Sequence, residues 1–365
     1  MRTVINFNFM TLGARVRLCS TSSLSLSFAA LLAGCPVNNP PPPPPPAEIA
    51  QCEGAGYTAF DVSNHAEQDT RVAGQTQIKA LLESATPADA ATKFPEAQAI
   101  YASAADLQAK VQGRTDDHLD GRPNVGADID ARIVAAYAAG AAATTALEIE
   151  IAAEIIDKSM TEFFFLSVFH EMVQGQAAKW DEAYGYYGAG PDNALDGVQA
   201  FARVAKNRDG NNGTAFEAAI FQKLVEGSCV LGGKLEELGV ETVDVLNDTE
   251  MSAIIDDIDV SMRQVLAASV GHEAFEIDLV KAELVLTPGD VTLQNTARVK
   301  LVELDGFLRP IERLLRAEGA AATADALRNP LNVALADTTA GWIDTYDTAV
   351  VVTTLEAAFA IDIVE

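Results

Sequence analysis

Residues 287–315 read TPGDVTLQNTARVKLVELDGFLRPIERLL. Apolar side chains recur along this stretch at three- and four-residue spacing, which is the spacing of one face of an α-helix. They are Leu293, Ala297, Leu301, Leu304 and Leu308. The pattern continues past Pro310 through Ile311, Leu314 and Leu315, so we expect the proline to kink the helix without ending it. One long amphipathic helix is thereby predicted in the C-terminal half.

Similar signals extend outward from this helix. Ile254, Ile258, Met262 and Val265 form a second stripe after the capping pair Asn247 and Glu250. Thr86-Pro87-Ala88-Asp89 and Thr287-Pro288-Gly289-Asp290 predict two helix starts, each with Thr as the cap and Pro as the first helical residue. Residues 350–354 have strand composition but run into a helix-favouring segment, so we assign them to a terminal helix. These helix signals together predict that residues 55–365 form an all-α body.

The N-terminus carries an export signal. Arg2, Arg15 and Arg17 precede an apolar run that ends in Leu32-Ala33-Gly34-Cys35, and no acidic residue occurs before Glu48. The alternative is an ordinary buried helix. The segment resembles the signal of bacterial lipoproteins, which implies cleavage after residue 34 and lipid attached to Cys35. Since Pro36 is not the Asp associated with inner-membrane retention, we expect anchoring in the outer membrane.

Residues 35–54 form a predicted tether between the lipid and the body. Seven consecutive prolines occupy residues 40–46 and favour an extended polyproline II rod. A ligand for a proline-recognition domain is the alternative interpretation. The uncharged run at residues 133–147 is too short to span a bilayer, which needs about 20 residues, so lipid is the predicted membrane attachment.

The charge of the chain limits its partners. Lys and Arg number 25 against 52 Asp and Glu, for a formal net charge of −27. Such an excess argues against nucleic acid, whose phosphates require basic residues, and against adhesion to anionic lipid headgroups. High solubility, adaptation to salt and attraction of cations remain open.

Two cysteines remain beyond the signal and the lipidated residue. They are Cys52 and Cys229, and an exported compartment permits disulfides. We predict a Cys52–Cys229 bridge, with two buried free thiols as the alternative.

Aromatic residues concentrate between residues 163 and 188. On a helix, Trp180, Tyr184 and Tyr187 share one face together with Ala183. Such a face either lines a ligand pocket or fills the core of a bundle. Both interpretations stay open at this point.

The same segment carries a family resemblance. Trp180-Asp181-Glu182-Ala183-Tyr184-Gly185-Tyr186 is similar to a block found in uncharacterised bacterial lipoproteins related to the imelysins, and Gly74-Gln75-Thr76 resembles the opening of that family's first helix. The resemblance implies an imelysin-like helical body of one bundle or two packed bundles. It also implies an association with iron uptake, although some imelysins were once described as peptidases.

The resemblance directs attention to Gly271-His272-Glu273-Ala274-Phe275-Glu276, the nearest match to the family's Gly-x-His-x-x-Glu motif. Here the carboxylate follows His by four residues, which still places His272 and Glu276 on one helical face. His170, Glu171 and Asp181 are candidate additional ligands, and a site rich in carboxylates suits iron or another hard cation. The alternative is a histidine solvated or capped at a helix end.

Catalytic motifs are missing from the sequence: it has no His-Glu-x-x-His, Gly-x-Ser-x-Gly, phosphate loop or dinucleotide-binding glycine pattern. Residues 209–213 resemble a calcium loop but lack its closing Glu, so we expect a turn.

From the export signal, the family resemblance and the missing catalytic motifs, we expect a lipid-anchored, non-enzymatic binding protein of the envelope. Its ligand would be a metal, a metal complex or another molecule, and it would work beside a transporter. The alternative is a structural or protein-interaction module, and a hydrolase ranks third.

Overall fold

The structure is a computed structural model that describes residues 60–188 and 199–364. All of these residues belong to one compact unit, Pro44–Glu365. They form α-helices joined by short turns and two 3-10 helices, and within these ranges no β-strand occurs. The predicted all-α class is confirmed. The predicted signal (1–34) and tether (35–54) lie outside the described residues.

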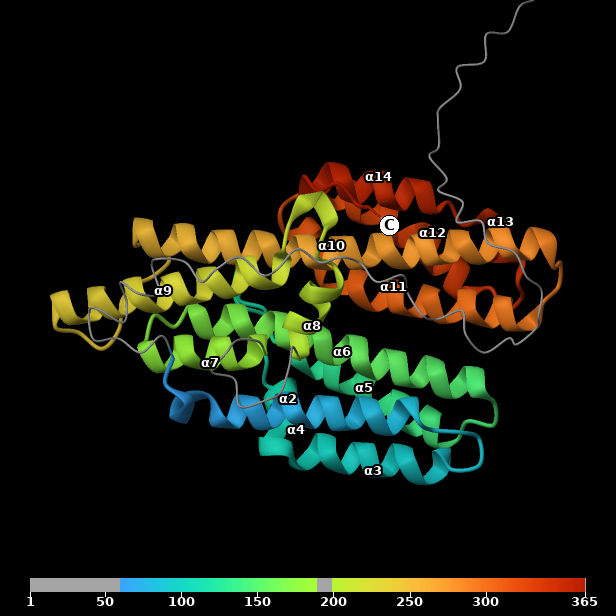
Figure 1. The fold of residues 1–365 in the computed structure, drawn as a ribbon, viewed down its shortest axis with the longest axis horizontal. Coiled ribbons are helices and arrows are strands. Elements are labelled where there is room, and N and C mark those ends of the chain that lie inside the picture. Colours follow the sequence, from blue (N-terminus) through green and yellow to red (C-terminus); the bar gives the residue numbers. More distant parts are fainter. Residues whose placement is uncertain (1–59, 189–198, 365) are drawn as a thin grey trace, which may run out of the picture. The chain divides into compact units, whose positions relative to one another are not determined.

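The first group of helices covers the N-terminal half of the described chain (Figure 1). Helix α2 packs against α3 and α7, and α5 packs against α3, α4 and α6. The bounds are α2 (Val62–Glu83), α3 (Ala90–Ser103), η1 (Ala104–Asp106), α4 (Leu107–Gln112), α5 (Gly126–Ala141), α6 (Ala146–Met172) and α7 (Ala177–Tyr187).

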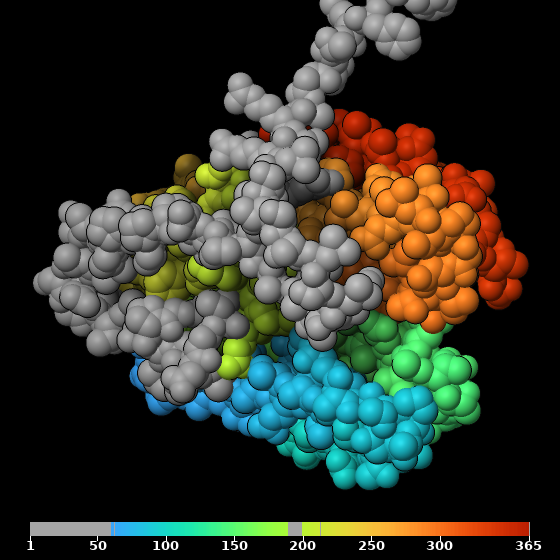
Figure 2. Space-filling view, turned by 45° about the vertical axis from the view of Figure 1, so that its right-hand side comes forward, coloured from blue at the N-terminus to red at the C-terminus, as the bar shows by residue number. Residues whose placement is uncertain are grey.

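The second group covers the C-terminal half, where α10 and α11 form a hairpin. Helix α14 packs on α10 and α12 packs on α11, while α9 joins α10 to α7. Figure 2 shows the orange and red segments of this group lying over the cyan and green segments of the first. The bounds are α8 (Ala200–Asn207), η2 (Asn211–Gly213), α9 (Phe216–Leu238), α10 (Thr249–Leu286), α11 (Val291–Ala317), α12 (Ala321–Ala336), α13 (Gly341–Thr345) and α14 (Thr348–Phe359).

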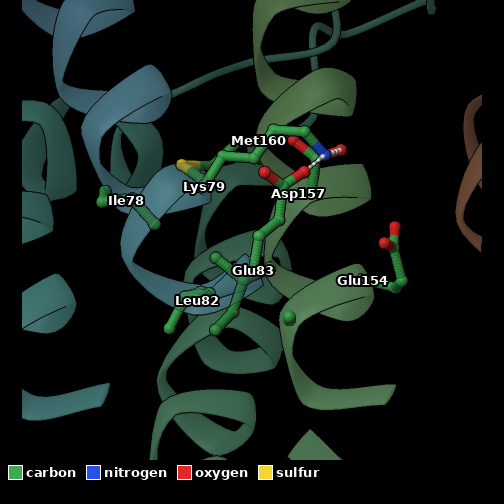
Figure 3. Close-up of a pocket in the computed structure, with 9 residues that line it drawn as sticks. Ile78, Lys79, Leu82, Glu83, Glu154, Asp157 and Met160 are labelled. Carbon is green, nitrogen blue, oxygen red and sulfur yellow. Dashed lines mark hydrogen bonds and ion pairs between the residues drawn. The ribbon is translucent and has the colours of Figure 1, made fainter. Parts of the chain in front are cut away.

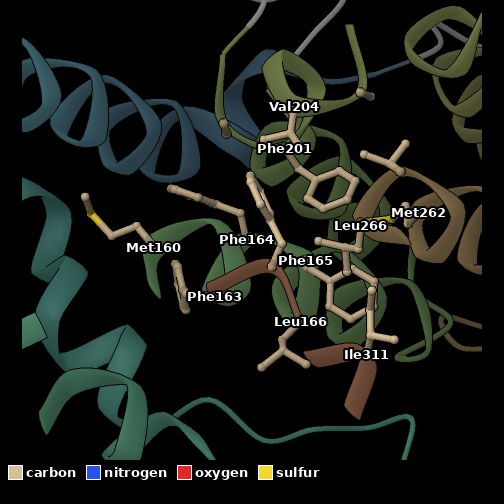
Figure 4. Packing of buried hydrophobic residues seen from close by; sticks show 14 of the residues in the cluster. Met160, Phe163, Phe164, Phe165, Leu166, Phe201, Val204, Met262, Leu266 and Ile311 are labelled. Carbon is tan, nitrogen blue, oxygen red and sulfur yellow. The ribbon is translucent and has the colours of Figure 1, made fainter. Parts of the chain in front are cut away.

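Helix α6 joins the two groups. Every residue from Ile156 to Val168 is buried, so this helix contacts protein on all sides. Figure 4 shows the consecutive rings of Phe163, Phe164 and Phe165 fanning out toward neighbouring helices. The side chains around them come from α8, α10 and α11 and include Phe201, Met262, Leu266 and Ile311. The two helix groups therefore share one continuous hydrophobic core.

The long helices confirm the apolar stripes but not the predicted caps. Helix α11 runs through Pro310, as expected, yet it begins at Val291, and Asp290 accepts hydrogen bonds from the backbone N–H groups of Thr292 (2.8 Å) and Leu293 (3.3 Å). Helix α10 likewise begins after Asp248, not Asn247. Helix α3 begins after Asp89, whose side chain accepts from the backbone N–H of Thr86 and not from a helix N–H. The predicted Thr86, Asn247 and Thr287 caps are therefore wrong. At α10 and α11 the chain instead places the carboxylates of Asp248 and Asp290 against the free N–H groups of the first turn.

Residues 350–354 lie inside α14, so their helical assignment is confirmed. Helix α7 ends at Tyr187, and Gly188 follows it with a φ of +84°, a backbone conformation that favours glycine. None of the helices within residues 60–188 and 199–364 combines the length and the apolar composition of a membrane-spanning segment.

Candidate functional site

The predicted metal pair His272 and Glu276 lies on one face of α10, as the spacing predicts. Their Nε2 and Oε1 atoms are 4.0 Å apart, and both side chains are about one-third exposed. The pKa of His272 is lowered to about 4, chiefly by burial and also by the positive charges of Arg208 and Lys300, which together outweigh the attraction of Glu276. Two neighbouring cations repel a metal ion as they repel a proton, so this pair is a poor cation site.

The other predicted ligands are held by partners of their own. His170 Nδ1 lies 3.1 Å from Asp117 Oδ2, and Asp181 Oδ2 accepts a hydrogen bond from Asn64 at 2.8 Å. Glu171 forms ion pairs of 3.3 Å with Arg114 and with Lys179. Among the described residues, no group of three or more His, Cys, Asp or Glu could hold a metal ion. The expectation that the five predicted ligands meet in space is therefore wrong.

The aromatic block on α7 lies in the core. Trp180, Tyr184 and Tyr187 are buried, which favours the core-packing interpretation over the ligand pocket. The indole of Trp180 donates to the Leu224 carbonyl at 2.8 Å, and the ring of Tyr184 stacks on Phe60 with centroids 3.8 Å apart. Tyr187 donates its hydroxyl to a backbone carbonyl of α9. Their polar atoms and ring faces thus fix α7 against its neighbours.

Two of the three cysteines named in the predictions, Cys35 and Cys52, lie outside the described residues. Lipidation of Cys35 and the Cys52–Cys229 disulfide therefore stay predictions. Cys229 lies on α9, partly buried against the hydrophobic core.

A buried charge cluster joins α2, α6, α8 and α11. Asp157 on α6 lies 3.3 Å from Lys79 Nζ and 3.1 Å from Arg203 Nη2, and Lys158 lies 3.4 Å from Glu303. Figure 3 shows Lys79 and Asp157 meeting across the gap between α2 and α6. The cavity at this point has a volume of about 10 Å³, which is room for about one water molecule. This cluster therefore stabilises the fold and is not a ligand site.

A larger groove lies where α5 and α11 each pack against α6. Its volume is about 400 Å³, within the range of small-molecule sites. The wall formed by α5 carries Ala135, Ala136 and Ala139 beside Arg132, and these small alanine side chains leave the space open. Gly306 on α11 also lines the groove, and its missing Cβ lets α11 approach Lys158 on α6 closely. The lining residues are Arg132, Ala135, Ala136, Ala139, Ile155, Ser159, Val302, Asp305, Gly306, Arg309 and Leu335.

Arginines gather at one end of this groove, which we call the alanine groove. A second cavity of about 240 Å³ shares Arg132 and Arg309 with it, and we call this cavity the arginine pocket. Its other lining residues are Val125, Asp128, Glu162, Glu312, Arg313 and Arg316. Glu162 is buried on α6 and forms ion pairs with both Arg132 and Arg313. The two cavities together form the candidate site.

The sequence contains a signal for this site. Arg309, Arg313 and Arg316 follow one another at helical spacing on α11, opposite its apolar stripe, in a chain that is poor in basic residues. The pattern predicts a basic helix face. It does not predict that Arg132, more than 170 residues earlier, lies across from that face.

Comparison with known proteins gives no further guide: no protein-family model, curated protein or solved structure matches this chain.

Proposed function

We propose that this chain is a lipid-anchored, non-enzymatic protein of the cell envelope that binds a small molecule in the alanine groove. The observation that carries the proposal is the groove itself, with an apolar wall and a few converging polar groups at one end. The missing catalytic motifs favour binding over turnover. Lipid at Cys35 would keep the protein at the outer membrane, beside a transporter.

A bulky side chain placed in the groove tests the proposal. Ala139 is an exposed residue on α5 that lines the groove, so Ala139→Trp fills it at small cost to the fold. Ala138→Trp is the matched control, because Ala138 is also exposed on α5 but does not line the groove. The unlipidated chain, residues 36–365, contains the whole compact unit and avoids detergent.

Calorimetric titration with monomeric 1-decanol and decanoate supplies the measurement. We expect the native chain and Ala138→Trp to bind at least one of these probes, and Ala139→Trp to bind neither. Circular dichroism of each variant shows whether the helical fold is retained. Binding that survives Ala139→Trp unchanged, or no binding by the native chain, would reject the alanine groove as the ligand site.

Anchoring is tested separately. Metabolic labelling with a lipid precursor should mark the wild-type chain and leave Cys35→Ala unlabelled, and only the wild type should fractionate with membranes. A labelled Cys35→Ala variant would overturn the lipoprotein assignment without affecting the groove.

A protein-interaction module is the second candidate. Apolar side chains at the turn between α10 and α11 are exposed, with Val285 at 77%, Leu286 at 82% and Val291 at 65%. Figure 2 shows this orange end of the hairpin at the molecular surface. A photo-crosslinking residue at Leu286 should then form one discrete adduct in cells, while one at exposed Lys110 on α4 should not. The absence of an adduct at Leu286 would remove this candidate.

A further inference from the structure

We propose that residues 114–125, the loop between α4 and α5, form a pH-sensitive clasp. The clasp ties the first helix group to the second while His118 is protonated, and it loosens when His118 is neutral. The proposal goes beyond ligand binding and needs no occupant in the alanine groove. Val125 ends this loop and Arg313 is bound by it, and both residues line the arginine pocket. The clasp therefore adjoins the candidate site.

The first residues of the clasp are fixed by charge. Four of its side chains make charge-assisted contacts with residues on α6, α10 and α11. The N···O distances are 3.3 Å for Arg114 and Glu171 on α6, 3.2 Å for Asp116 and Arg313 on α11, 3.1 Å for Asp117 and His170 on α6, and 3.0 Å for His118 and Asp259 on α10. The contacts with α10 and α11 connect the first helix group to the second.

Little apolar surface holds the clasp closed. Leu119 and Val125 are only partly buried, and residues 120–124 are exposed. The backbone N–H of Asp116 donates to the Pro123 carbonyl at 2.9 Å, so the two arms of the loop are joined and can move as a unit. A segment with few buried apolar contacts opens at a low cost in free energy. The contacts of the charged side chains therefore decide whether the clasp stays closed.

His118 is the group that changes its charge. Its Nδ1 lies 2.9 Å from Asp116 Oδ1, and its Nε2 lies 3.0 Å from Asp259 Oδ1. Phe165 and Phe169 on α6 stack on the imidazole, with centroids 5.0 and 3.9 Å away, and carry no charge of their own. Only the protonated imidazole has an N–H group for each of the two carboxylates.

Both carboxylates have an arginine as a second partner. Arg313 on α11 lies 3.2 Å from Asp116, and Arg263 on α10 lies 2.7 Å from Asp259. The carboxylates therefore stay ionised when His118 loses its proton. Whichever nitrogen of the neutral imidazole keeps its hydrogen, the other turns a lone pair toward a carboxylate oxygen, and one contact of the clasp is lost.

The direction of the switch follows from these neighbours. Burial lowers the pKa of His118, but hydrogen bonds with Asp116 and Asp259 and their negative charges outweigh it, so the pKa is raised above 6.5. The clasp is therefore closed in acid and loosens as the pH rises through the folded-state pKa of His118.

Amide hydrogen exchange measures the opening. The wild-type chain, as residues 36–365, is exchanged at pH 6 and pH 9, with exchange times scaled to the intrinsic rate at each pH. The amides of Asp116, Leu119 and Arg122 report on the clasp because each donates a hydrogen bond within the loop. We expect their protection to be about tenfold lower at pH 9, which corresponds to the loss of one charge-assisted hydrogen bond.

Low concentrations of urea separate local opening from global unfolding. Urea accelerates exchange in proportion to the surface that the opening exposes. The buried amides of α6 at residues 160–168 should therefore respond to urea. The amides of the clasp should respond little and should be less protected than those of α6 at both pH values.

Two variants remove the switch in opposite directions. In His118→Gln a neutral side chain donates to one carboxylate only, so the clasp should be loose at both pH values. In Asp259→Asn the amide donates to the neutral imidazole and its oxygen still accepts from Arg263, so the clasp should stay closed at both. Asp256→Asn is the matched control, because Asp256 is exposed on the same helix, and it should behave as wild type.

The outcomes decide for or against the clasp. Loop protection that is the same at pH 6 and pH 9 in wild type overturns it, and so does a pH-dependent fall that persists in Asp259→Asn. Exchange of the clasp and α6 with equal protection and equal urea dependence also overturns it, because the loop then opens only when the whole protein unfolds. If circular dichroism shows that His118→Gln is unfolded, the comparison of wild type with Asp259→Asn decides.

Discussion

His118 Nε2 lies 3.0 Å from Asp259 Oδ1, so one buried imidazole joins the loop before α5 to helix α10. Its Nδ1 lies 2.9 Å from Asp116 Oδ1, and its ring stacks on Phe169 with centroids 3.9 Å apart. A neutral imidazole has only one N–H, whereas two carboxylates here require two donors. Burial alone lowers the pKa of His118, but hydrogen bonds and attraction from Asp116 and Asp259 outweigh it, and the pKa is raised above 6.5.

This geometry predicts a pH-dependent contribution to stability. Because the folded-state pKa of His118 exceeds its unfolded value, its stabilisation is complete below about pH 6.5 and is lost as pH rises through the folded-state pKa. Urea unfolding of wild type and His118→Gln between pH 5.5 and 9 measures it. The stability advantage of wild type should shrink as pH rises. A difference that stays constant over this range would show that the pKa of His118 is the same in the folded and unfolded protein, and one that grows with pH would show that His118 is neutral in the folded protein.

His272 should behave in the opposite way. Its pKa is lowered to about 4, so the folded protein favours the neutral imidazole and loses stability as pH falls from 6.5 toward 4. The ring is about one-third exposed, so we expect this loss to be small. Its NMR resonance, assigned with His272→Gln, should titrate near pH 4. A midpoint at or above 6.5 would indicate an acidic environment and would revive the predicted cation site.

Local patterns in the sequence predict much of this fold. The stripe from Leu293 to Leu308 lies on α11, and every apolar residue of the α10 stripe is buried. The caps are harder to predict because Thr, Asn and Asp occur side by side and each can accept the same backbone N–H. Which of these side chains accepts the hydrogen bond depends on where the backbone enters the helix, and in the structure this places Asp290 and Asp248 at the cap positions.

The candidate site depends on contacts between distant segments. Periodicity places Arg309, Arg313 and Arg316 on one face of α11, but the identity of the helix opposite is a tertiary property. The same limit applies to His272 and Glu276, whose shared face is predicted correctly. Their neighbours Arg208 and Lys300, which make the site unfavourable for a cation, come from the turn after α8 and from α11.

A glycine on α9 should be essential for the packing of Trp180. A Cβ atom at Gly227 would lie 2.0 Å from Cζ2 of the indole, and the bond from Nε1 to the Leu224 carbonyl keeps the ring in place. Gly227→Ala should lower the free energy of unfolding by about 1–3 kcal/mol. Gly233→Ala, on the same helix in open space, should instead raise it by about 0.5–1 kcal/mol. Equal stability of the two variants in urea would contradict this packing.

The predicted Cys52–Cys229 disulfide would tie the start of the body to α9. Closure of so long a loop contributes about 4–5 kcal/mol in the chain-entropy model, less any strain. Mass mapping of non-reduced peptides from the exported protein should recover the linked pair. Reductant should lower the stability of the wild type and leave Cys229→Ser unchanged. Recovery of both cysteines as freely alkylated thiols would exclude the bridge.

Lys158 should be among the most important polar residues of the core. Its Nζ lies 2.8 Å from Glu154 Oε2, 3.1 Å from Asp157 Oδ2 and 3.4 Å from Glu303 Oε2. Burial lowers the pKa of Lys158, but the three carboxylates outweigh it and raise the pKa well above its ordinary value. The ammonium group is therefore charged throughout the physiological range, and it neutralises acids that have little access to water.

Lys158→Met keeps the volume and removes that charge. We expect a loss of about 3–5 kcal/mol in the free energy of unfolding, because the carboxylates remain buried without their shared cation. The loss should diminish at acid pH, since burial already raises the pKa of Glu154 and its protonation relieves the repulsion. Lys110→Met on the exposed face of α4 is the control and should change stability by less than about 0.5 kcal/mol. If both variants unfold at the same urea concentration, Lys158 does not hold α6 and α11 together.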